Sequence, residues 1–460
     1  MSHQAYSAES FLEVYDLDNR SGVNKDKDFF PNVHRANLRI DRKARAIRNF
    51  YKKHRSQSSK LNANRKEQAR KLFKNLKTEK KRKREILTHE LQRISEIISS
   101  KSFSISLQQG FANGKSTYTH GATPEEYYAL KQTAINIRRI YRVKQSSRNA
   151  ICSQIHNMIT DGYKYHIVRA DIKSFYESVP QKSLIGKLEF DSLLSIKSRR
   201  ILKQVLETYA AANGGTTKGI PRGVNVSADL AELYMRDLDE KIKQLEGVCF
   251  YARYVDDIIV FFAQPKHLES QPRLPGVSQV INSFGLEVNE EKTYEVSISK
   301  KPNLEYLGYV FHCSGENSKV ALSQKKMDRY RTRLTRTLKD YQRDKSINEK
   351  RAYRSLLARL HFLTGNTQLS NAKRNAHTGI YFSNPILTDL SQLRDLDMLL
   401  SLWAWRELSA KPTLKSEVNK LSFEVGFMRR RMVRFNRHKK PGDRDEMNKI
   451  VRAWSYAEKS

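Results

Sequence analysis

The chain has 460 residues, of which 85 are Lys or Arg and 49 are Asp or Glu, so its net charge is +36. Because a charge of this size repels itself in a compact fold, we expect an anionic partner, and nucleic acid fits best. No apolar run is long enough to span a membrane, residues 1–30 lack the apolar centre of a signal peptide, and Cys152, Cys249 and Cys313 form no C-x-x-C pair. These features argue against a membrane protein, a disulfide framework and a structural zinc site, and they predict a cytoplasmic protein.

Residues 1–103 are expected to form a basic helical N-terminal extension. Aromatic and polar residues mix without a clear period over the first forty positions, and the composition becomes helical and strongly basic over 41–100. Within that segment, apolar residues recur at helical spacing at Leu87, Leu91, Ile94 and Ile98. The basic run over 80–84 is typical of a solvated helix face, but its surroundings have the same sign, so a phosphate-contacting arm is an equal alternative.

Residues 104–322 are expected to form an α+β domain, because short strands alternate with helices. The predicted strands span 165–170, the two halves of 248–262, 286–296 and 304–311. The predicted helices of this domain span 197–211 and 228–245. Residues 323–410 are again helical, with helices up to Tyr341, over 353–363 and over 387–408, and with a stop signal at Gly365–Asn366. Residues 411–460 form a basic tail.

The sharpest local feature is the pair Asp256 and Asp257, which interrupts the apolar segment 248–262. Adjacent carboxylates in apolar surroundings are costly, because desolvation and mutual repulsion both oppose ionisation, and divalent metal ions reverse that effect. Neighbouring side chains on a strand point to opposite faces, so a tight turn is needed to aim both carboxylates at one site. Together with Asp171, at the end of the strand over 165–170, they form a set that can hold two Mg²⁺ ions for phosphoryl transfer.

Five segments in chain order resemble motifs A to E of reverse transcriptases, at 171–179, 219–227, 254–257, 286–293 and 304–308. The resemblance implies an α+β right-hand polymerase. Its fingers and palm would span 104–322 and its helical thumb 323–410, with the basic extension 1–103 and the basic tail 411–460 outside them. It also implies the activity of an RNA-directed DNA polymerase, which is a nucleotidyltransferase.

The resemblance assigns a role to each position that matches a motif. Asp171, Asp256 and Asp257, with the backbone carbonyl of Ile172, would hold two Mg²⁺ ions, and Lys292 would act as a general acid toward the leaving pyrophosphate. The implied nucleotide-binding residues are Lys144, Arg148, Tyr176, Arg222 and Gly223, of which the first two match a clamp on the incoming triphosphate. The implied primer-grip residues are Tyr306, Leu307 and Gly308.

Tyr176 bears on the choice of sugar. Five positions after the aspartate of motif A, reverse transcriptases resemble one another in carrying a bulky aromatic residue, which would clash with a ribose 2′-hydroxyl. RNA-copying RNA polymerases tend to carry a polar residue there that binds this hydroxyl. With Tyr at position 176, the resemblance implies that the substrates are deoxynucleoside triphosphates.

The details of the motifs resemble a bacterial subgroup. The chain has Tyr-Val-Asp-Asp at 254–257 and Pro-Arg-Gly at 221–223, unlike group II introns and retrons, and we see no residue set typical of a ribonuclease H or a homing endonuclease. Ala231–Glu232 and 362–384 resemble the defence-associated unknown-group and abortive-infection reverse transcriptases, and 11–22 resembles their type 3 system. This implies a cytoplasmic bacterial enzyme of antiphage defence that works with a non-coding RNA and a second reverse transcriptase, or with another copy of itself.

The implied partners are a structured non-coding RNA as template, a DNA product and dNTPs, with no membrane. The basic segments 41–100 and 427–440 would grip the RNA through its phosphates, and Tyr51 or Phe435 could stack on unpaired bases, although each of these residues more commonly packs between helices. Two alternatives stay open. Tyr176 argues against an RNA-templated RNA polymerase, and the retained aspartates argue against an RNA-binding splicing maturase.

Overall fold

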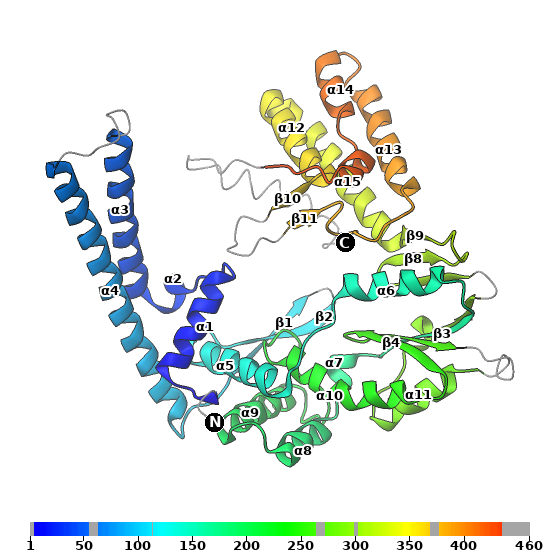
Figure 1. Ribbon diagram of the computed structural model, residues 1–460, viewed down its shortest axis with the longest axis horizontal. Helices are drawn as coiled ribbons and strands as arrows, with labels where there is room; N and C mark the ends of the chain where they lie inside the picture. The colour runs from blue at the N-terminus through cyan, green and yellow to red at the C-terminus, as the bar shows by residue number, and fades with distance from the viewer. Residues whose placement is uncertain are drawn as a thin grey trace. The chain divides into compact units, whose positions relative to one another are not determined.

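The computed structural model describes residues 4–54, 63–112, 114–263, 272–298, 302–368 and 377–434 (Figure 1). The chain forms two compact units: the first contains residues 1–112, 116–144 and 179–233, and the second contains 113–115, 145–178 and 234–460. Within the described ranges, no helix is both long and apolar enough to cross a bilayer. The end of the predicted basic tail, including Phe435, lies outside the described residues.

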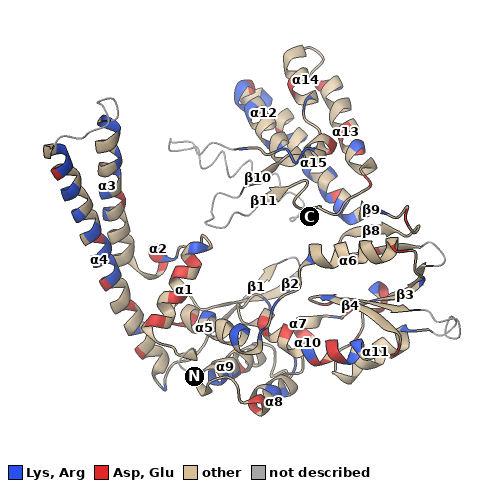
Figure 2. Cartoon of the chain, viewed as in Figure 1, with Lys and Arg blue, Asp and Glu red and all other residues tan. Residues whose placement is uncertain are grey.

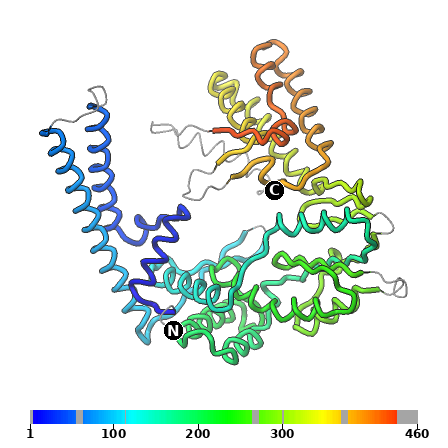
Figure 3. The backbone as a smooth tube through the Cα atoms, viewed as in Figure 1, coloured from blue at the N-terminus to red at the C-terminus, as the bar shows by residue number. Residues whose placement is uncertain are grey.

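The N-terminal part of the first unit is helical. It contains α1 (Ala8–Arg20), α2 (Asp26–Phe29), α3 (Pro31–Lys53) and α4 (Ala63–Ser99). Ser7 caps α1 by accepting a hydrogen bond from the backbone N–H of Ser10, and Pro31 begins α3, where its missing N–H leaves no helical hydrogen bond unmade. Helices α3 and α4 run side by side as a long antiparallel hairpin, which the tube in Figure 3 follows.

The rest of the first unit combines a β-hairpin with helices. It consists of the hairpin β1 (Leu107–Ala112) and β2 (Lys115–His120), then α5 (Pro124–Tyr141), α8 (Gln181–Asp191), α9 (Ile196–Ala212) and the start of α10 (Ser227–Lys243). The hydroxyl of Tyr6 lies 2.7 Å from that of Thr133 on α5 and 2.9 Å from that of Ser198 on α9. Because these groups are buried, their hydrogen bonds hold the start of the chain between the two helices.

The second unit is built on a four-stranded antiparallel sheet. In spatial order its strands are β4 (Val248–Tyr254), β5 (Asp257–Ala263), β3 (Tyr165–Asp171) and β6 (Tyr294–Ser297). The central strand β5 is apolar throughout Ile258–Phe262, and all five of these side chains are buried. Helices of this unit include α6 (Arg148–Thr160), α7 (Phe175–Ser178), most of α10 and α11 (Leu274–Ser283).

A smaller sheet and a helical region complete the second unit. The sheet contains β7 (Asn303–Tyr306), β8 (Tyr309–His312) and β9 (Lys319–Leu322). The helical region contains α12 (Gln324–Thr364), the strand pair β10 (Asn366–Gln368) and β11 (His377–Gly379), and α13 (Ser391–Glu407), α14 (Pro412–Asn419) and α15 (Phe423–Met428). Helix α12 is interrupted at Asn348, whose φ and ψ of −155° and 97° are not helical.

The structure confirms most of the predicted elements and corrects two others. Helices α9 and α10 and strands β3, β4 and β5 lie where the sequence predicted them. The single strand expected over 304–311 is wrong, because the chain turns back between β7 and β8. The strand expected over 286–296 is instead an isolated bridge at Val288, a 3₁₀ turn (Glu290–Lys292) and β6. The two helices expected up to Tyr341 and over 353–363 are confirmed, because the break at Asn348 divides α12 between them.

Candidate active site

The large sheet brings the three aspartates to one end. Asp171 ends β3 and is paired directly with Asp257, the first residue of β5. Tyr254 and Asp257 form the last pair of the β4–β5 hairpin, so Val255 and Asp256 make up its two-residue turn. The backbone N–H of Ile172 donates to the carbonyl of Asp256 at 3.1 Å, which fixes the turn against the end of β3. The predicted tight turn at the aspartate pair is therefore confirmed.

The turn contains an unfavourable backbone conformation. Val255 has a φ of 61°, a region that a β-branched residue rarely adopts. The guanidinium of Arg253, whose side chain is only 6% exposed, donates from Nη1 to the carbonyl of Val255 at 2.9 Å. The same guanidinium forms a two-pronged pair with Asp239 on α10, at 2.8 and 2.9 Å, and Tyr251 donates to this carboxylate at 2.5 Å. These buried contacts hold the turn in place.

Replacing Arg253 with Lys should destabilise the protein by about 2 kcal/mol, because an ammonium group cannot satisfy both carboxylate oxygens and the Val255 carbonyl at once. Urea unfolding followed by circular dichroism measures this change. The matched control is Arg331→Lys on α12, where the side chain is 45% exposed and pairs at the surface with Asp328 at 3.6 Å. Equal stability of the two variants would show that Arg253 does not support the turn.

The carboxylates carry strong electrostatic constraints. Burial, followed by the charge of Asp171, raises the pKa of Asp256, while Lys115 and Lys292 oppose the shift. Burial also raises the pKa of Asp257, with Asp171 and Asp256 adding to the effect and Arg169 opposing it. Because these like charges lie close together at the end of a buried sheet, they favour the binding of cations.

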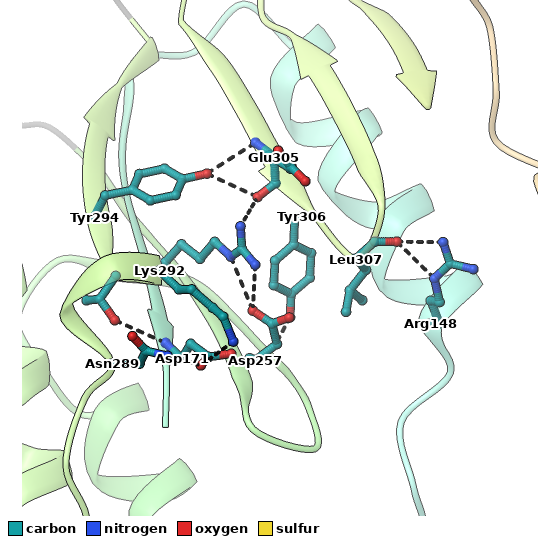
Figure 4. Close-up of polar contacts among 11 residues, drawn as sticks. Arg148, Asp171, Asp257, Asn289, Lys292, Tyr294, Glu305, Tyr306 and Leu307 are labelled. Carbon is teal, nitrogen blue, oxygen red and sulfur yellow. Dashed lines mark hydrogen bonds and ion pairs between the residues drawn. The ribbon is translucent and has the colours of Figure 1, made fainter. Parts of the chain in front are cut away.

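Positive side chains approach two of the carboxylates. Lys292 Nζ lies 3.2 Å from Asp171 Oδ2, so the predicted general acid is brought to the site (Figure 4). Arg169 contacts Asp257 Oδ1 from both Nε and Nη2 at 3.2 Å. Asn289 also donates to Asp171 Oδ2 at 3.2 Å, and the hydroxyl of Thr293 accepts from the backbone N–H of Asp171. Two different cations thus position two of the three aspartates.

Sequence reasoning missed Arg169, Asn289 and Thr293 as members of the site. Arg169 could have been found, because side chains two positions apart on a strand share a face, and Asp171 is two positions later on β3. Asn289 lies inside the segment that resembles motif D, but the residue type alone does not predict its contact with Asp171.

The predicted primer-grip residues lie in the turn of a hairpin. Tyr306 and Tyr309 are its last pair, and Leu307 and Gly308 between them have φ values of 46° and 75°. Two positive φ values in a two-residue loop are typical of a type I′ hairpin, although Leu is unusual there. The hydroxyl of Tyr306 donates to the backbone carbonyl of Asp257 at 2.8 Å (Figure 4). Arg169 Nη1 donates to the carbonyl of Glu305 at 2.8 Å. The turn is therefore tied to the aspartates by direct contacts.

Arg148 belongs to this turn as well. Its Nε and Nη2 donate to the carbonyl of Leu307 at 3.0 and 2.5 Å, and its guanidinium carbon lies 4.9 Å from the ring centroid of Tyr309. A triphosphate contact was predicted for Arg148 from the family resemblance. The structure gives the same guanidinium a positioning role at the hairpin turn, where it holds the carbonyl of a residue with positive φ.

The other predicted residues are distributed over both units. In the second unit, Tyr176 is half-buried on α7, with its ring 5.6 Å from that of Phe175, and Ile172 is buried. In the first unit, Lys144 lies in the exposed segment after α5, while Arg222 and Gly223 precede α10.

Gly223 has a structural requirement of its own within the first unit. Its φ is 98°, and a Cβ atom there would lie 2.8 Å from the carbonyl oxygen of Tyr118. The neighbouring carbonyl of Arg222 accepts from the backbone N–H of Tyr118 at 2.6 Å. The glycine therefore lets this loop pack directly against the β2 strand.

The donor chemistry of the three aspartates fits Mg²⁺. Hard divalent ions prefer carboxylate oxygens, and burial, with the neighbouring carboxylates, raises the pKa values of Asp256 and Asp257, so a bound cation would stabilise their ionised forms. Among the described residues, no three acidic, histidine or cysteine side chains are already gathered into a metal-binding group. The carboxylates of Asp171 and Asp257 face Lys292 and Arg169 instead. Because directly paired residues have Cα atoms about 5 Å apart, side-chain rotation is enough to bring these two carboxylates together.

Comparison with known proteins gives one family and several remote structures. A model of the reverse transcriptase (RNA-dependent DNA polymerase) family matches residues 65–311, more than half of the chain. No curated protein matches the sequence.

Telomerases are among the similar solved structures. Apo telomerase from Candida tropicalis aligns over 78% of this chain and 63% of its own, with 13% identity and a TM-score of 0.38. A form truncated from its C-terminal domain aligns over 48% and 56%, with 16% identity and a TM-score of 0.33. Telomerase from Candida albicans in complex with a TWJ fragment of telomeric RNA aligns over 72% and 51%, with 14% identity and a TM-score of 0.33. The chain spans between half and two thirds of the length of these three chains, and the likeness is remote.

Proposed function

The chain belongs to the reverse transcriptase (RNA-dependent DNA polymerase) family, and we propose that it extends a primer with deoxynucleotides by copying an RNA template. The observation that carries this proposal is the placement of Asp171 directly opposite Asp257, with Asp256 in the adjoining turn. Three carboxylates at the end of one sheet are the ligand set that two-metal phosphoryl transfer needs. The primer-grip turn, tied to Asp257 by Tyr306, supports the same reading.

We propose that Asp171, Asp256 and Asp257, with the carbonyl of Ile172, hold two Mg²⁺ ions. When bound, such ions activate a primer 3′-hydroxyl and neutralise the charge of the triphosphate. Arg169 keeps Asp257 oriented, and Lys292, whose Nζ is 3.2 Å from Asp171, can supply a proton to the leaving pyrophosphate. The turn at Leu307–Gly308 would hold the primer terminus near these groups.

The incoming nucleotide would be bound by the residues whose positions match the family's motifs. We propose that Lys144 neutralises the triphosphate, because its side chain is exposed in the segment between α5 and α6. Tyr176 would pack against the sugar and reject a 2′-hydroxyl. Arg222 and Gly223 would contribute the loop beside the nucleotide, as their match to motif B implies. The contact of Arg148 with the triphosphate stays a prediction beside its observed contact with Leu307.

We propose that the α3–α4 hairpin binds the RNA. Over 31–53 and 63–84 it carries 19 Lys or Arg residues against 3 Asp or Glu residues, a net charge of +16. Figure 2 colours these basic positions along both helices, whereas the final part of α4 carries more acidic residues. At a rise of 1.5 Å per residue, the helices are about 35 and 55 Å long, enough to follow several phosphates of a folded RNA.

Exposed aromatic rings near the end of the hairpin add a second kind of contact. Tyr51 and Phe73 are 44% and 49% exposed, and their ring centroids are 6.4 Å apart. Aromatic rings surrounded by basic residues are suited to stacking on unpaired bases of an RNA loop. A structured RNA therefore fits this hairpin better than a uniform duplex does.

Replacing Lys74, Lys77 and Lys81 of α4 with Gln should weaken RNA binding. The slope of log K against the logarithm of the salt concentration should become less steep by up to about three, because each phosphate contact releases a counterion. Fluorescence anisotropy from 50 to 300 mM salt measures both quantities. The control changes Lys101, Lys182 and Lys203 to Gln, which removes the same charge outside the hairpin. If the two triple variants lose affinity equally, the hairpin is not a specific RNA contact.

The identity of the template can be tested on the protein from cells. We propose that a structured non-coding RNA co-purifies with the protein and directs deoxynucleotide incorporation, and that the chain acts with a second reverse transcriptase or another copy of itself. Sequencing of the co-purified RNA and of the DNA product tests this, since the product should be complementary to part of that RNA. A product unrelated to any bound RNA would contradict the proposal.

We further propose a role in antiphage defence in the bacterial cytoplasm. The support is the resemblance of Ala231–Glu232 and of 362–384 to the defence-associated reverse transcriptases. Plaque counts on bacteria that express the wild-type chain, with any partner genes, or its Asp256→Asn variant test the proposal. Protection that survives the substitution would instead favour an RNA-binding role without DNA synthesis.

A further inference from the structure

A basic pocket lies beside the primer-grip turn in the second unit. It has a volume of about 410 Å³ and is lined by residues at the start of α6, on the first turns of α12 and at Phe382–Ser383. Four of its lining residues are cationic, namely Arg148, Lys326, Arg329 and Arg333. None of the described lining residues is acidic. Such a concentration of positive charge requires an anion for its neutralisation.

The contacts of Lys326 show how crowded these charges are. Its Nζ lies 4.2 Å from the ring centroid of Tyr309 and 3.4 Å from the carbonyl oxygen of Ser383. Burial, followed by the charge of Arg148 and then those of Arg329 and Arg333, lowers the pKa of Lys326 to about 7. The ammonium form is therefore disfavoured in the protein alone, and a bound anion would restore it.

Two further features of the pocket favour a phosphate group. Helix α6 begins at Arg148, after Ser147 as its N-cap, and the N-terminal turn of a helix attracts anions. The Nε and Nη2 groups of Arg148 contact the Leu307 carbonyl, and the same side chain lines the pocket. Arg148 can therefore contact the turn and an anion in the pocket together.

We propose that this pocket binds a backbone phosphate of the primer strand and that Arg148 couples the bound phosphate to the primer-grip turn. The assignment of the ligand as a primer strand rests on the proposed polymerase function, whereas the inference that the pocket binds an anion does not. A free nucleotide or inorganic phosphate has the same chemistry. The contact with Leu307 favours a strand, because a strand held by the turn must place its backbone phosphates within a few ångströms of it.

The test compares variants that remove equal charge inside and outside the pocket. The double variant Lys326→Gln and Arg329→Gln should bind a labelled primer–template duplex about tenfold more weakly, because it loses two charge-assisted contacts. The matched control is Lys325→Gln with Arg331→Gln, whose exposed positions alternate with the pocket positions on α12, and its affinity should change less than twofold. Anisotropy without added nucleotide measures binding alone, and circular dichroism verifies that both variants are folded.

The pH dependence of duplex binding gives a second test, in which no positive charge is removed from the pocket. Above pH 7, binding should weaken by up to tenfold per pH unit, because Lys326 must gain a proton when the phosphate binds. Burial raises the pKa of Cys152 to about 11 and raises that of Tyr309, so neither group titrates between pH 7 and 9. The groups facing Lys326 are thus Arg148 and Cys152 of α6, Arg329 and Arg333 of α12, Tyr309 of β8 and the carbonyl of Ser383. Lys326→Arg should bind with little pH dependence.

The outcomes separate the possible ligands. Equal affinities of the pocket and control variants for the duplex, together with unchanged pH dependence in Lys326→Arg, would overturn the proposal that the pocket binds a phosphate. If duplex binding is unchanged but the KM for dNTPs rises in the pocket variant, the ligand is a nucleotide and the strand assignment is wrong. If the duplex binds as expected but the wild-type protein incorporates no nucleotide, the polymerase proposal fails and the pocket stands.

Discussion

Changing Asp256 to Asn should lower deoxynucleotide incorporation by about 1,000-fold or more. The substitution replaces a metal-binding carboxylate with a neutral amide, and a lost metal contact removes several kcal/mol of transition-state stabilisation. RNA binding should not change, because the proposed RNA-binding hairpin belongs to other elements of the chain. Primer extension on an RNA template, under single-turnover conditions, measures the rate directly.

The control for Asp256→Asn is Glu246→Gln, which makes the same carboxylate-to-amide change at an exposed position before β4. Burial and Asp171 raise the pKa of Asp256, so the amide removes a charge that is unfavourable in the metal-free fold. The melting temperature of Asp256→Asn without Mg²⁺ should therefore equal or exceed that of the wild type. Polymerase activity within a few fold of the control would exclude Asp256 from the metal site.

Replacing Tyr176 with Val should increase ribonucleotide incorporation relative to deoxynucleotide incorporation on the order of 100-fold. The half-buried ring follows the end of β3 by five residues and is proposed to occupy the space that a ribose 2′-hydroxyl would need. Removal of a bulky group from a sugar pocket changes discrimination by about this factor. The ratio of kcat/KM for matched NTP and dNTP pairs measures the selectivity.

Tyr176→Phe is the matched control, because it keeps the ring and removes only the hydroxyl. Its sugar selectivity should be that of the wild type within a few fold. Selectivity that changes in Tyr176→Phe and not in Tyr176→Val would show that hydrogen bonding, and not ring size, controls the choice of sugar.

The centre of the site could be predicted because its signals are local. An apolar run interrupted by Asp256 and Asp257 predicts a buried hairpin, and the β4–β5 hairpin confirms it. The match of the family model over 65–311 confirms the resemblance to reverse transcriptases, and with it the predicted α+β right-hand polymerase fold. The pairing of Asp171 with Asp257 needed the structure, because sequence patterns do not determine which residues of two distant strands lie opposite each other.

Other features escaped prediction for identifiable reasons. The β7–β8 turn was missed because Leu307 is apolar and rarely adopts a positive φ, so Gly308 was its only turn signal. The contact between Arg148 and Leu307 joins residues 159 positions apart, beyond the reach of any local pattern. Helix α1 did have a signal, since Phe11, Val14 and Tyr15 are spaced for one helical face and are all buried.

The most direct test of the central claim is incorporation of single nucleotides on a defined RNA template annealed to a primer, with purified wild-type protein and Mg²⁺. The account predicts that only the dNTP complementary to the next template base is added, that the matching NTP is added poorly, and that Asp256→Asn adds neither. Addition independent of the template base, or equal addition by Asp256→Asn, would contradict the assignment of RNA-directed DNA synthesis to these three aspartates.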